Sequence, residues 1–275
     1  MAYRTVLTYH DGDAQSAARL SAATGVAHSL GAHLSVLALG YDPSVPPYAF
    51  GAAGGAAMLD MVTHSREAAA ERAALANEAL RLAGVAGDVQ PLTCTLSTMA
   101  QVLGAEARFA DLVVLCQPYG DDVDEAAGQA LEGALFDGDS AVLVCPAGME
   151  GIAPETVLVG WNGSREALRA VRRALPLLTA AKRVEVDIID PSPGDAMPGE
   201  RLATFLARHG VPVEVSAQPR QGGPVSATLA QRVRETGAEL LVMGAYGHSR
   251  FREYVLGGAT RDILSHVTTP VLMAH

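Results

Sequence analysis

The chain repeats one order of strand-like segments twice, and this duplication limits its fold more than any other feature. Apolar segments of matching pattern recur in the same order, about 150 positions apart near the start of each half and about 128 apart near its end. The matched pairs are 5–7 and 156–158, 33–39 and 184–190, 110–115 and 238–243, and 141–144 and 270–273. Equal order with near-equal spacing indicates two copies of one unit.

Helical patterns fill the gaps between these segments. They cover 14–30, 58–82 and 98–109 in the first half and 165–175, 199–209 and 224–236 in the second. Strand alternating with helix implies right-handed crossovers and a mostly parallel sheet. We therefore predict an α/β protein of two tandem open parallel-sheet, Rossmann-like domains with about five strands each.

Proline and glycine mark the predicted boundaries. The stretch 146–154 has both residues and is interpreted as a connection, which divides the chain into a first domain at 1–147, a linker at 148–154 and a second domain at 155–275. A second Gly/Pro-rich stretch, 41–55, is expected to be a loop after the second strand, where open α/β sheets place ligand-facing segments.

Composition and charge narrow the class of protein. Hydrophobic residues make up 49% of the 275 residues, enough for a buried core, and no apolar run is long enough to span a membrane. Because the first residues also lack the zones of a signal peptide, we expect a cytoplasmic protein. The formal charge of −10 argues against nucleic acid as the main partner.

The three cysteines, Cys94, Cys116 and Cys145, lack CxxC spacing. They are expected to be small core residues in a reducing compartment. A redox pair of Cys116 and Cys145 on neighbouring strands is the alternative.

A glycine-rich stretch follows the apolar run 239–243, at the expected carboxyl end of a strand. Ligands bind at such ends in open α/β sheets, and glycine lets the backbone approach a ligand closely. Gly257, Gly258, Ala259 and Thr260 precede a short helical pattern whose N–H groups are suited to phosphate oxygens, and His248, Ser249, Arg250 and Arg252 add donors and positive charge. The glycines could equally make a turn and a helix boundary. Neither GxxxxGK[ST] nor a GxGxxG after a strand is present.

The spacing Gly244-x2-Gly247-x9-Gly257, between a strand ending at Met243 and a final strand beginning at Pro270, resembles the nucleotide-binding signature of universal stress proteins. The order of segments in both halves resembles that family too. The likeness therefore covers nearly the whole chain, as a tandem member with nucleotide-binding α-hydrolase-type domains.

The resemblance implies an adenine-nucleotide site in the second half. Trp161, Asn162 and Ile188 would lie at the base, where backbone groups would read its edge, and Met243 and Gly244 would border the ribose. Gly247, Gly257, Gly258 and Ala259 would line the phosphates, with His248, Ser249, Arg250 and Thr260 beside them. Trp161 could instead pack at the rim of the sheet. Thr260 is otherwise an ordinary residue at the start of a helix.

Two residues of the second half depart from the family pattern. Asn162 stands where the family usually has Asp, which removes a charge but keeps an acceptor. Gly258 stands where the signature has Ser or Thr, which removes a hydroxyl donor worth roughly 0.5–1.5 kcal/mol. Ser249 and Thr260 are the candidates to replace that donor.

The first half departs completely from the signature. Its corresponding stretch places Cys116, Tyr119 and Gln129 opposite the three glycines, and four carboxylates lie within 121–125. These charges would repel a polyphosphate, and the stretch is expected to be a solvated acidic loop, with a cation site as the alternative. We expect one nucleotide site and one degenerate partner domain.

These observations favour a stress-response protein that binds ATP, with or without Mg²⁺, and acts as a nucleotide-dependent switch with an unidentified protein partner. A scaffold or carrier of non-nucleotide small ligands is the alternative. No catalytic residue and no resident metal site is assigned, because neither a recognisable nucleophile motif nor a metal-ligand spacing is present, so at most slow ATP hydrolysis is expected. The last strands of the halves, at 141–144 and 271–274, are expected to pair as a pseudo-dimer within the chain, and a homodimer of whole chains is compatible with the sequence.

Overall fold

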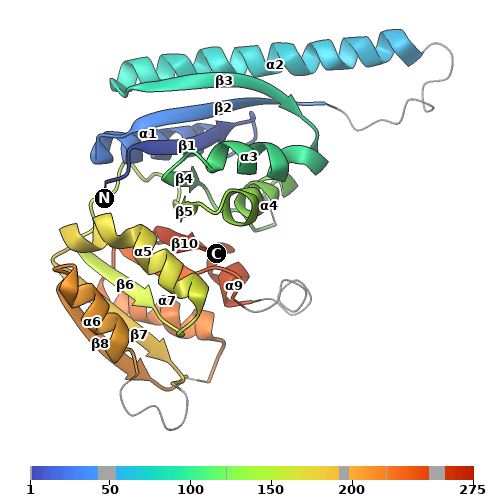
Figure 1. Ribbon diagram of the computed structural model, residues 1–275. Coiled ribbons are helices and arrows are strands. Elements are labelled where there is room, and N and C mark those ends of the chain that lie inside the picture. The colour runs from blue at the N-terminus through green and yellow to red at the C-terminus, as the bar shows by residue number, and fades with distance from the viewer. Residues whose placement is uncertain (1, 43–53, 122, 192–197, 221, 248–257) are drawn as a thin grey trace.

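A computed structural model describes residues 2–42, 54–121, 123–191, 198–220, 222–247 and 258–275. The described strands form one ten-stranded sheet, in the order β3-β2-β1-β4-β5-β10-β9-β6-β7-β8 (Figure 1). The first half supplies β1 (Thr5–His10), β2 (His33–Tyr41), β3 (Gly87–Cys94), β4 (Leu112–Leu115) and β5 (Ala141–Val144). The second half supplies β6 (Thr156–Gly160), β7 (Arg183–Ile189), β8 (Val213–Gln218), β9 (Leu240–Gly244) and β10 (Val271–Ala274).

Each half contributes five strands, and all strand pairs within a half are parallel, which confirms the predicted class. The halves join through one antiparallel pair, β5 with β10, in which Val144 faces Val271 and Val142 faces Met273. The expected pairing of the two last strands within the chain is therefore present. The halves share one continuous sheet rather than standing as two separate ones.

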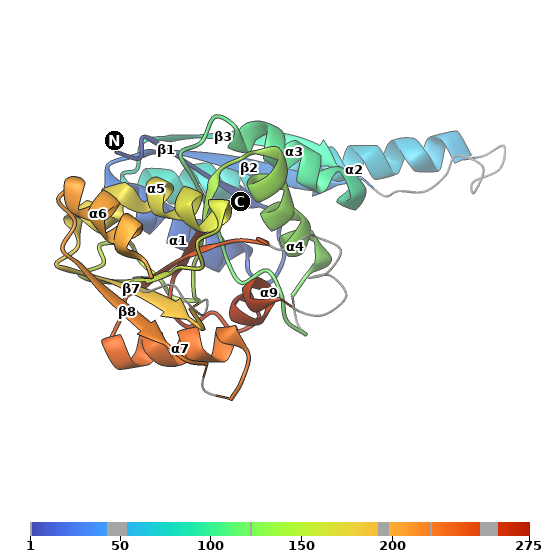
Figure 2. The ribbon, with the colours of Figure 1, turned by 60° about the horizontal axis from the view of Figure 1, so that its bottom comes forward.

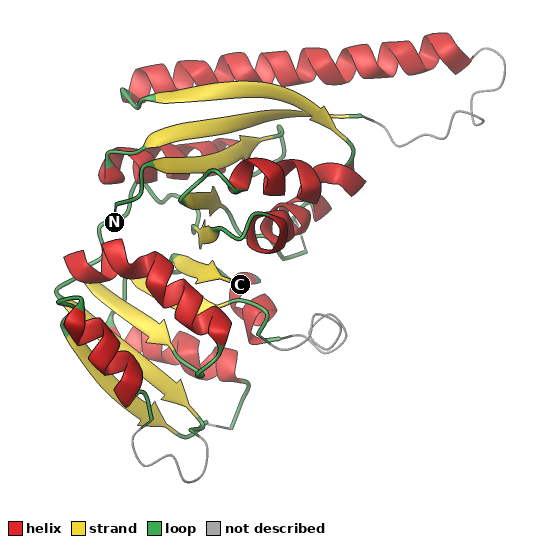
Figure 3. Ribbon diagram, viewed as in Figure 1, coloured by secondary structure: helices red, strands yellow, loops and turns green. Residues whose placement is uncertain are grey.

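Helices cover both faces of the sheet (Figures 1 and 3). One hydrophobic core includes residues of α1 (Ser16–Leu30), α2 (Gly54–Ala83), α5 (Arg165–Ala180) and α6 (Glu200–Arg208). The other includes residues of α3 (Met99–Ala107), α4 (Glu125–Glu132), α7 (Val225–Thr236) and α9 (Ala259–Leu264). The two copies thus place corresponding helices on the same faces, as the repeated crossovers require.

Burial separates the central strands from the edge strands. Every residue of β4, β5 and β10 is buried, because these strands are covered on both faces, and each reads as a continuous apolar run. The edge strands β3 and β8 are mostly exposed or half-buried, and β3 contains Pro91, which an edge strand tolerates. This exposure explains why the sequence indicated five strands per half without locating β3 and β8.

Two helices differ from the sequence prediction. Helix α2 starts at Gly54 rather than near 58, and its first turns extend beyond the end of the sheet (Figure 2). The expected acidic loop at 121–125 ends in a helix start: Asp124 caps α4, its carboxylate accepting a hydrogen bond from the Ala126 amide at 2.9 Å. Asp124 and Glu125 therefore complement the positive end of a helix instead of being wholly loop residues.

The connection at 146–154 lacks helix and strand, as expected from its prolines and glycines. It is held against the first half, since Ile152 is buried in the core and the Glu150 carbonyl occupies the space where a Cβ on Gly25 would lie. Among the described helices, none combines the length and apolar character needed to cross a membrane.

Candidate functional site

A cavity of about 520 Å³ opens at the carboxyl ends of β6, β7 and β9 in the second half. Its described lining residues are Gly160, Trp161, Asn162, Asp187, Ile189, Arg220, Pro224, Val225, Leu229, Met243, Gly244, Gly247, Gly258, Ala259, Thr260 and Asp262. This volume is within the range of small-molecule sites, and the place is where open parallel sheets bind ligands.

Most of the residues predicted for the nucleotide site meet at this cavity. Eight of them line it: Trp161, Asn162, Met243, Gly244, Gly247, Gly258, Ala259 and Thr260. Four others, His248, Ser249, Arg250 and Gly257, lie outside the described residues. The lining as a whole joins five stretches of the second half, within 160–162, 187–189, 220–229, 243–247 and 258–262.

Ile188 is not among the lining residues. Its side chain is buried in the core with α5 and α6, whereas its neighbours Asp187 and Ile189 border the cavity. Side chains alternate between the faces of a strand, so the position adjacent to the predicted one is directed to the site.

The corner between β6 and α5 is built from local hydrogen bonds. The Asn162 side-chain carbonyl accepts from the Ser164 amide at 3.1 Å, and Gly163 has φ +75°. The Ser164 hydroxyl then accepts from the Ala167 amide at 3.1 Å and caps α5. Asn162 thus fills a turn role that an Asp would also fill. Trp161 combines both expectations, since it packs against the core and borders the cavity.

Gly244 and Gly247, two glycines of the signature, differ in how closely their neighbours pack. A Cβ on Gly244 would lie 2.5 Å from the Ala167 amide nitrogen, so the end of β9 packs directly on the first turn of α5 and requires glycine. A Cβ on Gly247 would meet Glu166 Oε2 at 3.4 Å, which is ordinary contact, and Gly247 is not among the glycines with positive φ. The described residues around Gly247, which borders the cavity, therefore leave room for a Cβ.

The start of α9 closes the site on its other side. Gly258 caps this helix with no side-chain hydrogen bond, as expected where a hydroxyl residue is replaced. Thr260, in the first turn, is buried, and its hydroxyl accepts from the Tyr246 amide at 3.3 Å. The threonine therefore links α9 to the glycine-bearing segment after β9, in addition to lining the cavity.

The sequence prediction missed a group of charged residues around the cavity. Asp187 is fully buried and accepts a hydrogen bond from Arg232 Nε at 2.6 Å, and Glu185 pairs with the same guanidinium at 3.1 Å. The hydrogen bond to Asp187 raises the pKa of Arg232, although partial burial opposes the shift. Arg220, at the rim, pairs with Asp190 at 2.8 Å. The available signal was a pair of acids on one face of the strand 183–189, whose other face is apolar.

Comparison with known proteins identifies the family of the second half of the chain. The family model for the universal stress protein family matches residues 154–275. The chain belongs to this family. Among curated proteins, none matches the chain.

Solved universal stress proteins share the fold. One from Archaeoglobus fulgidus has a TM-score of 0.73 at 16% identity, covering 99% of this chain and 96% of its own. One from Pseudomonas aeruginosa, titled a putative universal stress protein, has a TM-score of 0.60 at 16% identity, over 98% and 92%. A universal stress protein crystallised in complex with cAMP is 31% identical over 45% of this chain and 98% of its own, with a TM-score of 0.36. The first two cover both halves of the ten-stranded sheet.

The first half of this universal stress protein fills the space that is a cavity in the second. Strand register makes Tyr9 the counterpart of Gly160, because Tyr9 faces Leu37 on β2 as Gly160 faces Asp187 on β7. The Tyr9 ring is 1% exposed, and Leu37 beside it is 2% exposed. A large ring therefore stands where the second half has a bare backbone.

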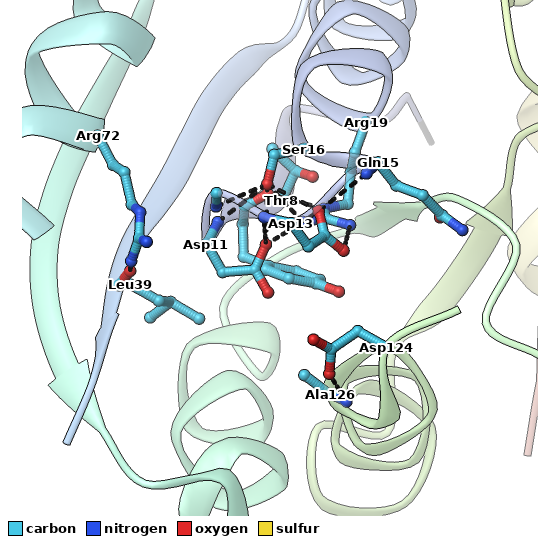
Figure 4. A network of polar contacts seen from close by, with 12 residues as sticks. Thr8, Asp11, Asp13, Gln15, Ser16, Arg19, Leu39, Arg72, Asp124 and Ala126 are labelled. Carbon is cyan, nitrogen blue, oxygen red and sulfur yellow. Dashed lines mark hydrogen bonds and ion pairs between the residues drawn. The ribbon is translucent and has the colours of Figure 1, made fainter. Parts of the chain in front are cut away.

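An arginine completes the filling of the first half (Figure 4). The Arg19 guanidinium lies 3.7 Å from the Tyr9 ring centroid, donates to the Tyr9 carbonyl at 2.9 Å and pairs with Asp11 at 2.6 Å. Asp11 is the counterpart of Asn162, and its other oxygen accepts from the Tyr41 hydroxyl at 2.8 Å. The Asp11 carboxylate is thus bound by side chains of the first half itself, Arg19 and Tyr41.

Charge and hydrogen bonding set the ionisation of Asp11. Burial alone would raise its pKa, but the Arg19 charge and the hydrogen bonds from Tyr41 and Ser16 outweigh burial and hold the pKa below its usual value. The carboxylate therefore stays ionised at neutral pH within a covered network.

The glycine-bearing segment of the second half contacts the first half. The hydroxyls of Tyr246 and Tyr119 lie 2.5 Å apart, and the Tyr246 ring centroid is 5.4 Å from that of Phe136. Tyr246 directly precedes Gly247 and has φ +53°. A change in the segment after β9 is thus positioned to reach the first half.

The three cysteines lie in the interior of the protein. Cys94, Cys116 and Cys145 are buried free thiols, and burial raises the pKa of Cys94 to about 11. A raised pKa leaves the reactive thiolate scarce. Within the described ranges, no group of three or more His, Cys, Asp or Glu side chains is arranged to hold a metal ion.

Proposed function

We propose that residues 155–275 bind an adenine nucleotide, ATP in the first place, with or without Mg²⁺. The observation that carries the proposal is the cavity at the carboxyl ends of β6, β7 and β9, which Gly244 and Gly247 of the glycine spacing border in a segment that the universal stress protein family model matches. Gly247 supports it most directly, since the described residues around it leave room for a Cβ. A glycine whose neighbours tolerate a side chain suits close approach of a ligand to the backbone.

We propose further that the nucleotide acts as a switch in a cytoplasmic stress response rather than as the substrate of a dedicated enzyme. The support is the contact of Tyr246 with Tyr119 and Phe136, which links the segment beside the cavity to the other half. A ligand shifts such an arrangement only if it binds one state more tightly than another. An unidentified protein would read the change.

Equilibrium binding tests the proposal. Trp161 borders the cavity and is the only tryptophan of the chain, so its fluorescence is a direct reporter, and calorimetry gives the stoichiometry. ATP, ADP, AMP and cAMP are titrated with and without Mg²⁺, and we expect one site per chain. If none of the four binds under either condition, the proposal is wrong.

Gly247→Val locates the site. The side chain is expected to block backbone approach and lower ATP affinity at least tenfold, while the unfolding temperature stays near that of the wild type because the added Cβ meets only ordinary contacts. Ala207→Val on the exposed side of α6 is the control for a β-branched residue placed away from the cavity. Unchanged ATP affinity in Gly247→Val would show that the nucleotide lies elsewhere.

A carrier of non-nucleotide small ligands is the second candidate, favoured by Gly258 and Asn162, which replace the residues usual in the family. It predicts no binding of the four nucleotides although the cavity is present. Hydrolysis is tested separately by phosphate release from ATP, and release no faster than in buffer is expected for a switch without dedicated catalysis.

A further inference from the structure

One oxygen of Asp187 has no hydrogen-bond partner. Oδ2 accepts from Arg232 Nε at 2.6 Å, whereas Oδ1 is covered and has no partner among the described residues. The side chain has no exposed surface, and the residue borders the cavity of the second half. A residue that lines the site therefore has a covered carboxylate oxygen without a donor among the described residues.

Such an atom needs an explanation, because nearly all buried polar groups in native proteins are hydrogen-bonded. A covered carboxylate oxygen without a donor is a substantial penalty to the folded state. A structure keeps this arrangement where a ligand or a bound molecule supplies the missing donor.

The first half shows that the fold does not require an acid at this position. Leu37 is the counterpart of Asp187, since it pairs with Tyr9 as Asp187 pairs with Gly160. Leu37 is buried in an apolar core on a strand of the same topology. The acid therefore occurs only in the half that has the open cavity.

Neutralising Arg232 does not require Asp187 either. The Arg232 guanidinium also pairs with Glu185 at 3.1 Å and with Glu235 at 2.8 Å. Glu185 lies two residues earlier on the same strand and is not among the lining residues of the cavity. Of the two strand acids, only Asp187 borders the ligand space.

We propose that Asp187 is a specificity residue whose carboxylate accepts a hydrogen bond from a donor group of the bound nucleoside. This inference rests on the proposed function. The donor is the exocyclic amine of adenine or a ribose hydroxyl, because a phosphate would be repelled by the carboxylate. The phosphates then lie away from β7, on the side of Gly247 and Gly258. Arg232 positions the carboxylate.

Ligand analogues test the assignment on the wild-type protein. ITP replaces the amine with an acceptor oxygen, and 2′-deoxy-ATP and 3′-deoxy-ATP each lack one hydroxyl. We expect one of the three to bind roughly 10- to 100-fold more weakly than ATP, the loss that follows when a charged acceptor is left without its donor. ITP identifies the base amine, and the deoxynucleotides identify the hydroxyl.

Asp187→Asn places an amide donor beside the cavity while its carbonyl keeps the bond to Arg232. The variant is expected to lose the discrimination, with ATP weakened toward the affinity of the rejected analogue. Glu185→Gln is the matched control, because it alters the same ion pair without touching the cavity, and it should keep the wild-type ratio. If Asp187→Asn unfolds, Asp187→Leu is measured in its place, because leucine is the residue at the corresponding position of the first half, Leu37.

Each outcome decides the point. Equal affinity of the wild type for ATP and all three analogues, or the same ratio in wild type and Asp187→Asn, overturns the role of Asp187 and leaves nucleotide binding intact. Failure of the wild type to bind ATP at all overturns the proposed function and this inference together.

Discussion

Replacing Arg19 with methionine tests whether an internal guanidinium stabilises the first half. Arg19 and Asp11 have side chains that are 1% and 0% exposed, and their ion pair is 2.6 Å long. Removing one partner of a buried pair typically costs about 3–5 kcal/mol, because the other charge stays covered and unpaired. The contact of the guanidinium with the Tyr9 ring adds about 1–2 kcal/mol when water is excluded. We expect Arg19→Met to lower the free energy of unfolding by about 3–5 kcal/mol at pH 7, with the ring contact partly replaced by methionine.

The loss should depend on pH with a defined sign. In the wild type the folded pKa of Asp11 is lowered, so its contribution is present above the unfolded pKa, about 3.9, and is lost as pH falls through the folded value. Without Arg19, burial is opposed only by the hydrogen bonds from Tyr41, Ser16 and the Asp13 amide, and we expect the folded pKa of Asp11 to rise above the unfolded one. The free energy of unfolding of the variant then falls as pH rises from about 4. Its difference from the wild-type value is therefore smaller at pH 4.5 than at pH 7.

Urea denaturation followed by circular dichroism at both pH values measures these quantities. Arg19 pairs with Asp13 as well, at 3.2 Å, but Asp11 is the more deeply buried of the two carboxylates. Asp11→Asn combined with Arg19→Met removes that charge and is expected to recover part of the lost stability at pH 7. Arg81→Met, which breaks the exposed pair with Glu78, is the control and should leave the midpoint unchanged. If the free energy of unfolding of Arg19→Met at pH 7 is within about 1 kcal/mol of the wild-type value, the ion pair of Arg19 and Asp11 does not stabilise the first half.

Two further changes test the frame of the open site. Gly244→Ala is expected to cost about 1–3 kcal/mol or more, because its Cβ would lie 2.5 Å from the Ala167 amide nitrogen, and an unchanged unfolding temperature would contradict that packing. Ser164→Ala removes the cap of α5 and should lower the free energy of unfolding in urea by about 1 kcal/mol, and no loss would show that the cap is dispensable.

The sequence predicted the architecture well because the signal was repeated. Apolar segments in one order, twice, indicated two parallel halves, and the fully buried runs of β4, β5 and β10 were unambiguous. The edge strands β3 and β8 were not located, since exposed strands lack an apolar run. The start of α4 was taken for loop because acids at a helix start resemble a solvated charge run.

The candidate site was predicted in outline only. Glycine spacing led to Gly244 and Gly247, but spacing does not tell that the first glycine is required by α5 while the second has room around it. Ile188 was predicted to contact the base through its backbone, which stays a prediction, whereas the sequence did not indicate that its neighbours Asp187 and Ile189 line the cavity. The sequence did not predict that Arg19 occupies the first half's counterpart of the cavity, because only the fold brings Arg19 against Tyr9.

The antiparallel joint of β5 and β10 has a consequence for stoichiometry. In a symmetric dimer of single domains, both protomers change together and a dimer falls apart on dilution. Here the two partners are covalently linked, so their meeting is independent of protein concentration and each can acquire its own substitutions. One half has Tyr9 and Arg19 in its own site and the other has Gly160 and a cavity. If the cavity of the second half binds a nucleotide as proposed, the stoichiometry is one ligand per chain at any protein concentration.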